Sequence, residues 1–85
     1  MGFASWIGNI SKEDAAIVTI LRSAGAVFHC RTNVPQTLCR RTGTDNFVFG
    51  LTVNPLIRAF SVAGSSGGEG ALLAMRGSLV GIGST

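Results

Sequence analysis

The 85 residues of this chain have a hydrophobic fraction of 46% and a formal net charge of +3. This length allows one small domain at most, and the apolar fraction excludes an intrinsically disordered chain. Charged residues make up only 13% of the sequence, about half the globular average. Because a small domain has proportionally the most surface to solvate, this composition suits an interior piece of a larger protein.

The first predicted element is a helix over residues 11–24. Ser11 is its expected N-cap, and two acidic residues follow in the first turn, where the helix dipole favours them. Ile17, Ile20, Leu21 and Ala24 follow the spacing of one buried stripe. Gly25 is the expected C-terminal stop.

A short apolar run, residues 26–30, predicts a buried strand. The segment 31–46 is polar and rich in turn residues, and Pro35 excludes helix at the residue before it. Residues 46–50 predict a short extended piece, and Asn54 with Pro55 predicts a turn. Strong helix formers predict a helix from Glu69 to about Gly77. Residues 78–83 predict a further strand, so the element order indicates an α/β fold class.

Several classes of function are disfavoured by the residues. The basic cluster of Arg40 and Arg41 lacks the interleaved aromatic residues of a nucleic-acid surface, and a solvated loop is expected there. No apolar run reaches the length of a membrane span. Cys30 and Cys39 lack metal-ligand spacing, and no secretory leader precedes them. We therefore expect two reduced, partly buried thiols in a cytoplasmic protein that binds neither nucleic acid nor membrane.

The segment "AGSSGGEGALLAMRGS", residues 63–78, has three interpretations. A flexible linker needs polar flanks, but an apolar helix follows here. A phosphate loop binds anions at a helix start, but the lysine of the P-loop pattern is absent and Glu69 would compete with an anion. The third interpretation, which we favour, is a serine held for chemistry in a constrained glycine-rich turn.

Four segments resemble the amidase signature family. "GSSGGEGALLAMRGS" is similar to the family's serine-glycine turn and helix, and "AGAVFHCRTNVPQT" is similar to its lysine-bearing strand and loop, GAVxxxKTNVPQ. "FVFGLTVNP" resembles the segment before the turn, and "SKEDAAIVTILRSAG" resembles the helix before the lysine strand. The resemblance covers nearly the whole chain in the right order and is nearest to the fungal acetamidase or general amidase branch.

This resemblance implies one large α/β domain with a mixed sheet covered by helices, of which residues 1–85 would be an incomplete piece. It implies hydrolysis of a small-molecule carboxamide through an acyl-enzyme, with a serine nucleophile, a bridging serine in a cis peptide and a lysine, and no cofactor. Ser65 matches the bridging serine. Ser66 is expected to bond backbone groups of the turn or to contact substrate.

The remaining polar residues have structural interpretations. Glu69 is expected to cap the following helix rather than act on substrate. Asn33 and Gln36 are expected to organise their loop by hydrogen bonds. His29 is expected to be a partly buried histidine rather than a general base.

The chain departs from the family pattern at two places. Arg31 stands at the lysine position, and an arginine cannot be deprotonated to act as a base. The family pattern continues into a segment with the nucleophile and oxyanion hole, whereas this sequence ends at Thr85, with Ser84 and Thr85 aligned to other positions.

We therefore expect an amidase-family hydrolase fragment that is inactive by itself. The alternative is a non-catalytic interaction protein, or a pseudogene product, that keeps part of the fold and pairs with a full-length amidase through its exposed sheet edge. Self-association of exposed sheet edges is also expected.

Overall fold

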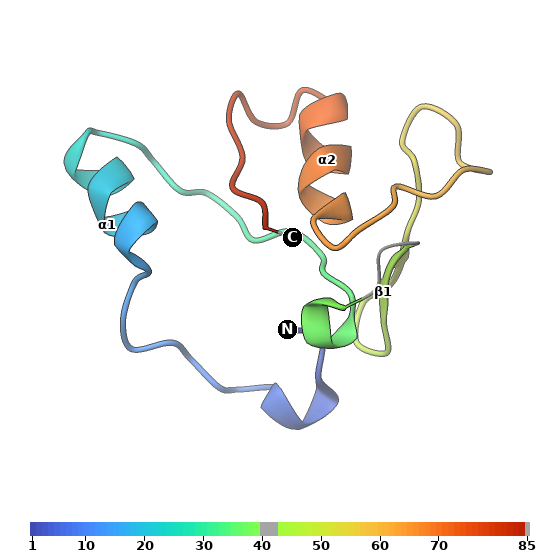
Figure 1. Cartoon of the computed structure of the whole chain (residues 1–85), viewed down its shortest axis with the longest axis horizontal. Helices are drawn as coiled ribbons and strands as arrows, with labels where there is room; N and C mark the ends of the chain where they lie inside the picture. Colours follow the sequence, from blue (N-terminus) through green and yellow to red (C-terminus); the bar gives the residue numbers. More distant parts are fainter. Residues whose placement is uncertain (40–42, 85) are drawn as a thin grey trace.

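The computed structural model describes residues 1–39 and 43–84 (Figure 1). Arg40 and Arg41, for which a solvated loop was predicted, lie outside the described residues, as does Thr85. In chain order the described elements are the 3-10 turn η1 (Ala4–Trp6), helix α1 (Ala16–Ser23), the 3-10 turn η2 (Gln36–Leu38), strands β1 (Thr44–Asn46) and β2 (Gly50–Thr52), and helix α2 (Gly67–Ala74). The chain is thus a small α/β piece, in agreement with the predicted fold class.

Helix α1 is shorter at its start than predicted. Its N-cap is Ala15, without a side-chain hydrogen bond, because the Ser11 hydroxyl donates instead to the carbonyl of Glu13. The predicted stop at Gly25 is confirmed. Gly25 has a φ of +94°, and the amides of Gly25 and Ala26 donate to the carbonyls of Arg22 and Leu21. This pair of bonds is the Schellman motif.

The apolar stripe of α1 is not buried within this chain. Ile17 is 47% exposed and Ile20 is 61% exposed. Helix α1 stands apart from α2 and the hairpin in Figure 1, and no element packs closely against it among the described residues. The apolar residues therefore lie along one face of α1, as predicted, but no described element covers that face.

The two predicted strands at 26–30 and 78–83 are wrong. Both segments are non-helical and unpaired among the described residues, and neither is a strand. A strand requires hydrogen bonds to a neighbouring strand, and no such neighbour lies beside either segment in the described chain. His29 and Cys30 are consequently exposed, and Cys39 is exposed too, so the expected partial burial of these side chains is corrected.

The hairpin of β1 and β2 replaces the extended piece predicted for residues 46–50. The strands are antiparallel, with Asp45 opposite Leu51 and Asn46 opposite Gly50. Residues 47–49 form the turn because the side-chain oxygen of Asn46 accepts hydrogen bonds from the amides of Val48 and Phe49. An asparagine that accepts from amides ahead of it favours a turn over an extended chain.

The turn predicted at Asn54 is confirmed. The side-chain oxygen of Asn54 accepts hydrogen bonds from the amides of Leu56 and Ile57 at 2.9 and 3.2 Å. The amide of Asn54 in turn donates to the carbonyl of Phe60. This loop leads the chain back toward α2.

Helix α2 begins two residues before its predicted start and ends three before its predicted end. Met75 is its C-cap, and the amides of Arg76 and Gly77 donate to the carbonyls of Leu73 and Leu72 in a second Schellman motif. Ala71 and Pro35 are buried apolar residues of the described chain, whereas Thr44, Asn46 and Ser65 are its buried polar residues. The packed centre is therefore mostly polar, and it lies between the hairpin and the start of α2.

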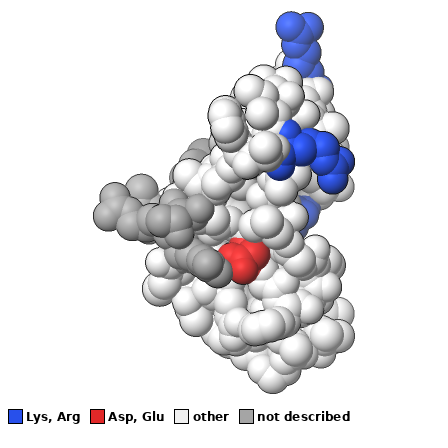
Figure 2. All heavy atoms as spheres, turned by 90° about the vertical axis from the view of Figure 1, so that its right-hand side faces the viewer, with Lys and Arg blue, Asp and Glu red and all other residues white. Residues whose placement is uncertain are grey.

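Much of the molecular surface remains open to solvent. The solvent-accessible area is 6650 Å², compared with about 4,800 Å² for a compact monomer of this mass. The radius of gyration is 13.4 Å, against about 12 Å for a compact chain of this length. Figure 2 shows one face on which uncharged residues predominate. Among the described residues, no helix has the length and apolarity needed to cross a bilayer.

Candidate functional site

The serine turn lies immediately before α2. Ser65 is 7% exposed, and the peptide bond between Gly64 and Ser65 is cis, the geometry that the resemblance implies for the bridging serine. Among the described residues, no hydrogen bond involves the Ser65 hydroxyl. The turn therefore buries a side chain of a type that can act as a nucleophile. Hydrogen bonds of neighbouring residues, and not of the Ser65 hydroxyl, stabilise it.

Strand β1 supports the turn on one side through Thr44. The Thr44 side chain is fully buried, and its hydroxyl donates to the carbonyl of Ala63 at 2.9 Å. A Cβ at Gly67 would collide with the Thr44 hydroxyl and with Val62. The glycine thus lets the helix start approach the strand. Sequence reasoning missed Thr44, because a single threonine in a polar segment carries no signal of burial.

The loop after Arg31 supports the turn on another side. The carboxylate of Glu69 accepts a hydrogen bond from the Thr32 hydroxyl at 2.8 Å. A Cβ at Gly68 would collide with the backbone of Asn33. The predicted capping role of Glu69 is corrected. Its carboxylate is hydrogen-bonded to the loop, and among the described residues it makes no hydrogen bond to the start of α2.

Asn33 connects the same loop to the hairpin, as predicted. Its side-chain amide donates to the carbonyl of Gly50 at 3.0 Å and to the hydroxyl of Thr52 at 2.9 Å. Its side-chain oxygen accepts from Asn46 at 2.6 Å. Gln36, to which a similar role was assigned, is exposed and has no hydrogen bond to the described residues. Asn33 therefore organises this loop without Gln36.

The segment near the end of the chain reaches the turn through Ser66. The Ser66 hydroxyl donates to the carbonyl of Ser84 at 2.9 Å and accepts from the amide of Ser84 at 2.8 Å. One prediction for Ser66 was that it bonds backbone groups of the turn. It does bond backbone groups, but they belong to Ser84, which lies 18 positions away. The local sequence carries no signal for this partner.

Arg31 precedes the supporting loop and is exposed. Within the described part of the chain, it makes no hydrogen bond or ion pair. Its neighbour Thr32 is bonded to α2, so the chain at position 31 is held near the start of that helix by the adjacent residue. A guanidinium there stays protonated and can donate hydrogen bonds, but it cannot accept a proton.

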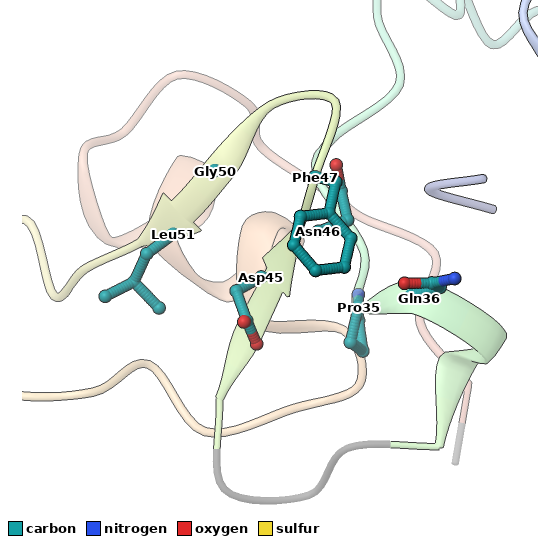
Figure 3. A pocket seen from close by; sticks show the side chains of 7 residues that line it. All are labelled: Pro35, Gln36, Asp45, Asn46, Phe47, Gly50 and Leu51. Carbon is teal, nitrogen blue, oxygen red and sulfur yellow. The ribbon is translucent and has the colours of Figure 1, made fainter. Parts of the chain in front are cut away.

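A separate hollow lies between η2 and the hairpin. It has a volume of about 330 Å³, and Figure 3 shows that its lining side chains come from the start of η2 and from the hairpin. These residues are Pro35, Gln36, Asp45, Asn46, Phe47, Gly50 and Leu51. Neither serine of the turn lines this hollow. In the described ranges, no group of three acidic, histidine or cysteine side chains could hold a metal ion.

The comparisons with known proteins point to one family. The family model described as Amidase matches residues 1–85. The chain is 47% identical over 85 residues to the acetamidase of Emericella nidulans, covering 98% of this chain and 15% of that protein. It is 48% identical over 85 residues to the acetamidase of Aspergillus oryzae, with 98% and 15% covered. It is also 47% identical over 83 residues to the vitamin D3 hydroxylase-associated protein of Gallus gallus, covering 98% and 18%.

The chain therefore spans less than a fifth of the length of these relatives. No solved structure matches it significantly. The family match extends over every segment that meets at the serine turn, from the loop after Arg31 to the residues beside Ser84. The chain belongs to the amidase family.

Proposed function

We propose that the chain supplies the serine relay turn of an amidase-type hydrolase and that the 85-residue polypeptide is inactive by itself. The observation that carries this proposal is the convergence of three segments on the turn. Thr44 holds it from β1, the Thr32 loop holds it through Glu69, and Ser84 is bonded to Ser66. Family membership over the whole chain supports hydrolysis of a carboxamide as the reaction class.

The proposed chemistry assigns one role to each residue position. A serine hydroxyl becomes a good nucleophile when a neighbouring group takes its proton. In the proposed relay, Ser65 passes a proton from the attacking serine hydroxyl to a neutral amine at position 31. The serine oxygen then bonds to the amide carbon, the carbon–nitrogen bond breaks, and the relay returns the proton to the leaving amine. Water then attacks the acyl-serine ester, which releases the carboxylic acid and restores the serine hydroxyl. With Arg31 the relay has no acceptor, because the guanidinium remains protonated.

A graft tests this proposal directly. In it, residues 1–85 replace the matched segment of the Emericella nidulans acetamidase, and release of ammonia from acetamide is measured. We expect no activity with Arg31, activity with Arg31→Lys, and loss of that activity when Ser65→Ala is added. A folded Arg31→Lys graft without activity would contradict the relay assignment. Equal activity with and without Arg31→Lys would contradict the inactivating role of Arg31.

The second candidate is a non-catalytic interaction protein, favoured by the open apolar surface. The excess over a compact monomer is about 1,900 Å², and exposed apolar side chains such as Ile17 and Ile20 contribute to it. In this reading the two-stranded sheet and α1 associate with a second polypeptide. Sedimentation velocity of the purified chain distinguishes the cases. A single well-defined complex, together with an inactive Arg31→Lys graft, would favour the interaction protein.

A further inference from the structure

A single side-chain hydrogen bond joins the start of α2 to the loop after Arg31. The half-buried carboxylate of Glu69 accepts from the half-buried hydroxyl of Thr32, which lies 37 residues earlier. The donor is neutral and the acceptor is ionised, and hydrogen bonds of this kind are about twice as strong as bonds between neutral groups. This bond fixes the Thr32 side chain, and with it the chain next to position 31.

The backbone around this bond is closely packed. A Cβ at Gly68 would overlap the backbone of Asn33 and lie against the Thr32 side chain, and a Cβ at Gly81 would overlap the Glu69 carboxylate. The carboxylate therefore lies between the 32–33 loop and the segment that continues to Ser84. One side chain thus contacts two of the segments that meet at the serine turn.

We propose that Glu69 is a positioning residue that acts through Thr32 to hold position 31 beside the serine turn. The inference rests on the proposed function, because position 31 matters only if its side chain exchanges a proton with the relay. Neither Glu69 nor Thr32 touches the reacting atoms in this proposal. Their effect is geometric: loss of the bond leaves the residue at position 31 in a wider range of positions relative to Ser65.

NMR relaxation of the backbone amides of the 85-residue chain tests the coupling without any activity. Thr32→Val removes the donor and keeps the side-chain shape, whereas Thr32→Ser keeps the donor. We expect the order parameters of the amides at 31–34 to fall from about 0.85 to about 0.6 or lower in Thr32→Val, with little change in Thr32→Ser or across 44–52. The matched control is Thr19→Val on exposed α1. A double variant of Thr32→Val with Glu69→Gln should be no more mobile at 31–34 than Thr32→Val alone.

Three outcomes of this experiment would overturn the proposal. One is an unmutated chain whose amides at 31–34 are already mobile, with order parameters of about 0.6 or lower. Another is a Thr32→Val variant with the same order parameters as the unmutated chain. The third is an equal fall in the order parameters at 31–34 and at 44–52, which would indicate a general stabilising contact rather than local positioning.

The acetamidase graft with Arg31→Lys gives the catalytic readout. We expect Thr32→Val to lower kcat at least tenfold with KM nearly constant, and Thr32→Ser to restore most of kcat. Glu69→Gln should lower kcat less, because its amide oxygen still accepts the hydrogen bond without the help of a charge. A fall in Tm without a fall in kcat would overturn the positioning role. If the Arg31→Lys graft itself is inactive, the proposed function fails, and the relaxation data still decide whether Glu69 holds the loop through Thr32.

Discussion

The side chain of Ser66 and the backbone of Ser84 form a reciprocal pair of hydrogen bonds. The hydroxyl donates to the carbonyl at 2.9 Å and accepts from the amide at 2.8 Å. Only a hydroxyl can make both bonds from one atom. The pair closes the chain back onto the residue beside Ser65, so both backbone bonds of Ser84 depend on a single side chain.

Ser66→Ala should release the 81–84 segment. Both bonds are partly exposed to solvent, so we expect their loss to lower the local stability of the 81–84 segment by about 1 kcal/mol in total. The measurement is amide exchange at Ser84, which should become several times faster. Ser78→Ala is the control, because the Ser78 hydroxyl bonds the carbonyl of Val80 only two residues away. Unchanged exchange at Ser84 in Ser66→Ala would contradict the closure.

Asn46→Asp should unfold the hairpin, whereas Asn54→Asp should be tolerated. The Asn46 amide donates to Asn33 and to the carbonyl of Val34. A carboxylate would turn both contacts into repulsions, at a cost of about 2–4 kcal/mol. Among the described residues, the Asn54 side chain bonds only through its oxygen, which accepts from two amides, so aspartate keeps those bonds. Amide exchange across 44–52 compares the two variants, and equal effects would contradict the network.

Gly68→Ala and Gly70→Ala should have opposite effects although both lie in α2. A Cβ at Gly68 would overlap the backbone of Asn33, whereas a Cβ at Gly70 meets open space. We expect Gly68→Ala to lower the free energy of unfolding by about 1–3 kcal/mol. Gly70→Ala should stabilise the helix by about 0.5–1 kcal/mol. Tm values of the acetamidase graft measure both, and a tolerated Gly68→Ala would show that the loop does not pack on α2.

For the second candidate, with another copy of this chain as the partner, Ile17→Lys with Ile20→Lys should weaken self-association of the purified chain. Both side chains are exposed on α1, and burial of each one against a second copy would contribute about 1.5–3 kcal/mol. Sedimentation velocity over a range of concentrations should show at least a tenfold rise in the dissociation constant. Thr19→Lys with Ser23→Lys adds the same charge to the same helix and serves as the control. An equal effect of the two pairs would indicate charge repulsion instead.

Features fixed by local chemistry were predictable from the sequence. The stop at Gly25, the turn at Asn54 and the existence of both helices each depend on residues close together in the chain. The strands expected at 26–30 and 78–83 failed because a strand depends on a partner that its own residues do not specify. An apolar run alone therefore could not establish pairing.

The candidate site was only half predictable. The motif around Ser65 identified the turn, and Asn33 was recognised as an organiser of its loop. Thr32 and Thr44 were missed because their roles arise from contacts with residues 37 and 19 positions away. A short polar side chain with a distant partner looks like any solvated loop residue until the fold brings the partner to it.

The buried polar centre has a consequence for how this chain tolerates mutation. Thr44, Asn46 and Ser65 are buried while Ile17 and Ile20 are exposed, which reverses the usual arrangement of globular domains. In a saturation scan of the isolated chain, hydrophobicity would therefore be a poor guide to sensitivity. The largest losses of stability should occur at small buried polar residues. There a near-isosteric apolar substitution such as Thr44→Val removes a hydrogen bond without leaving a void.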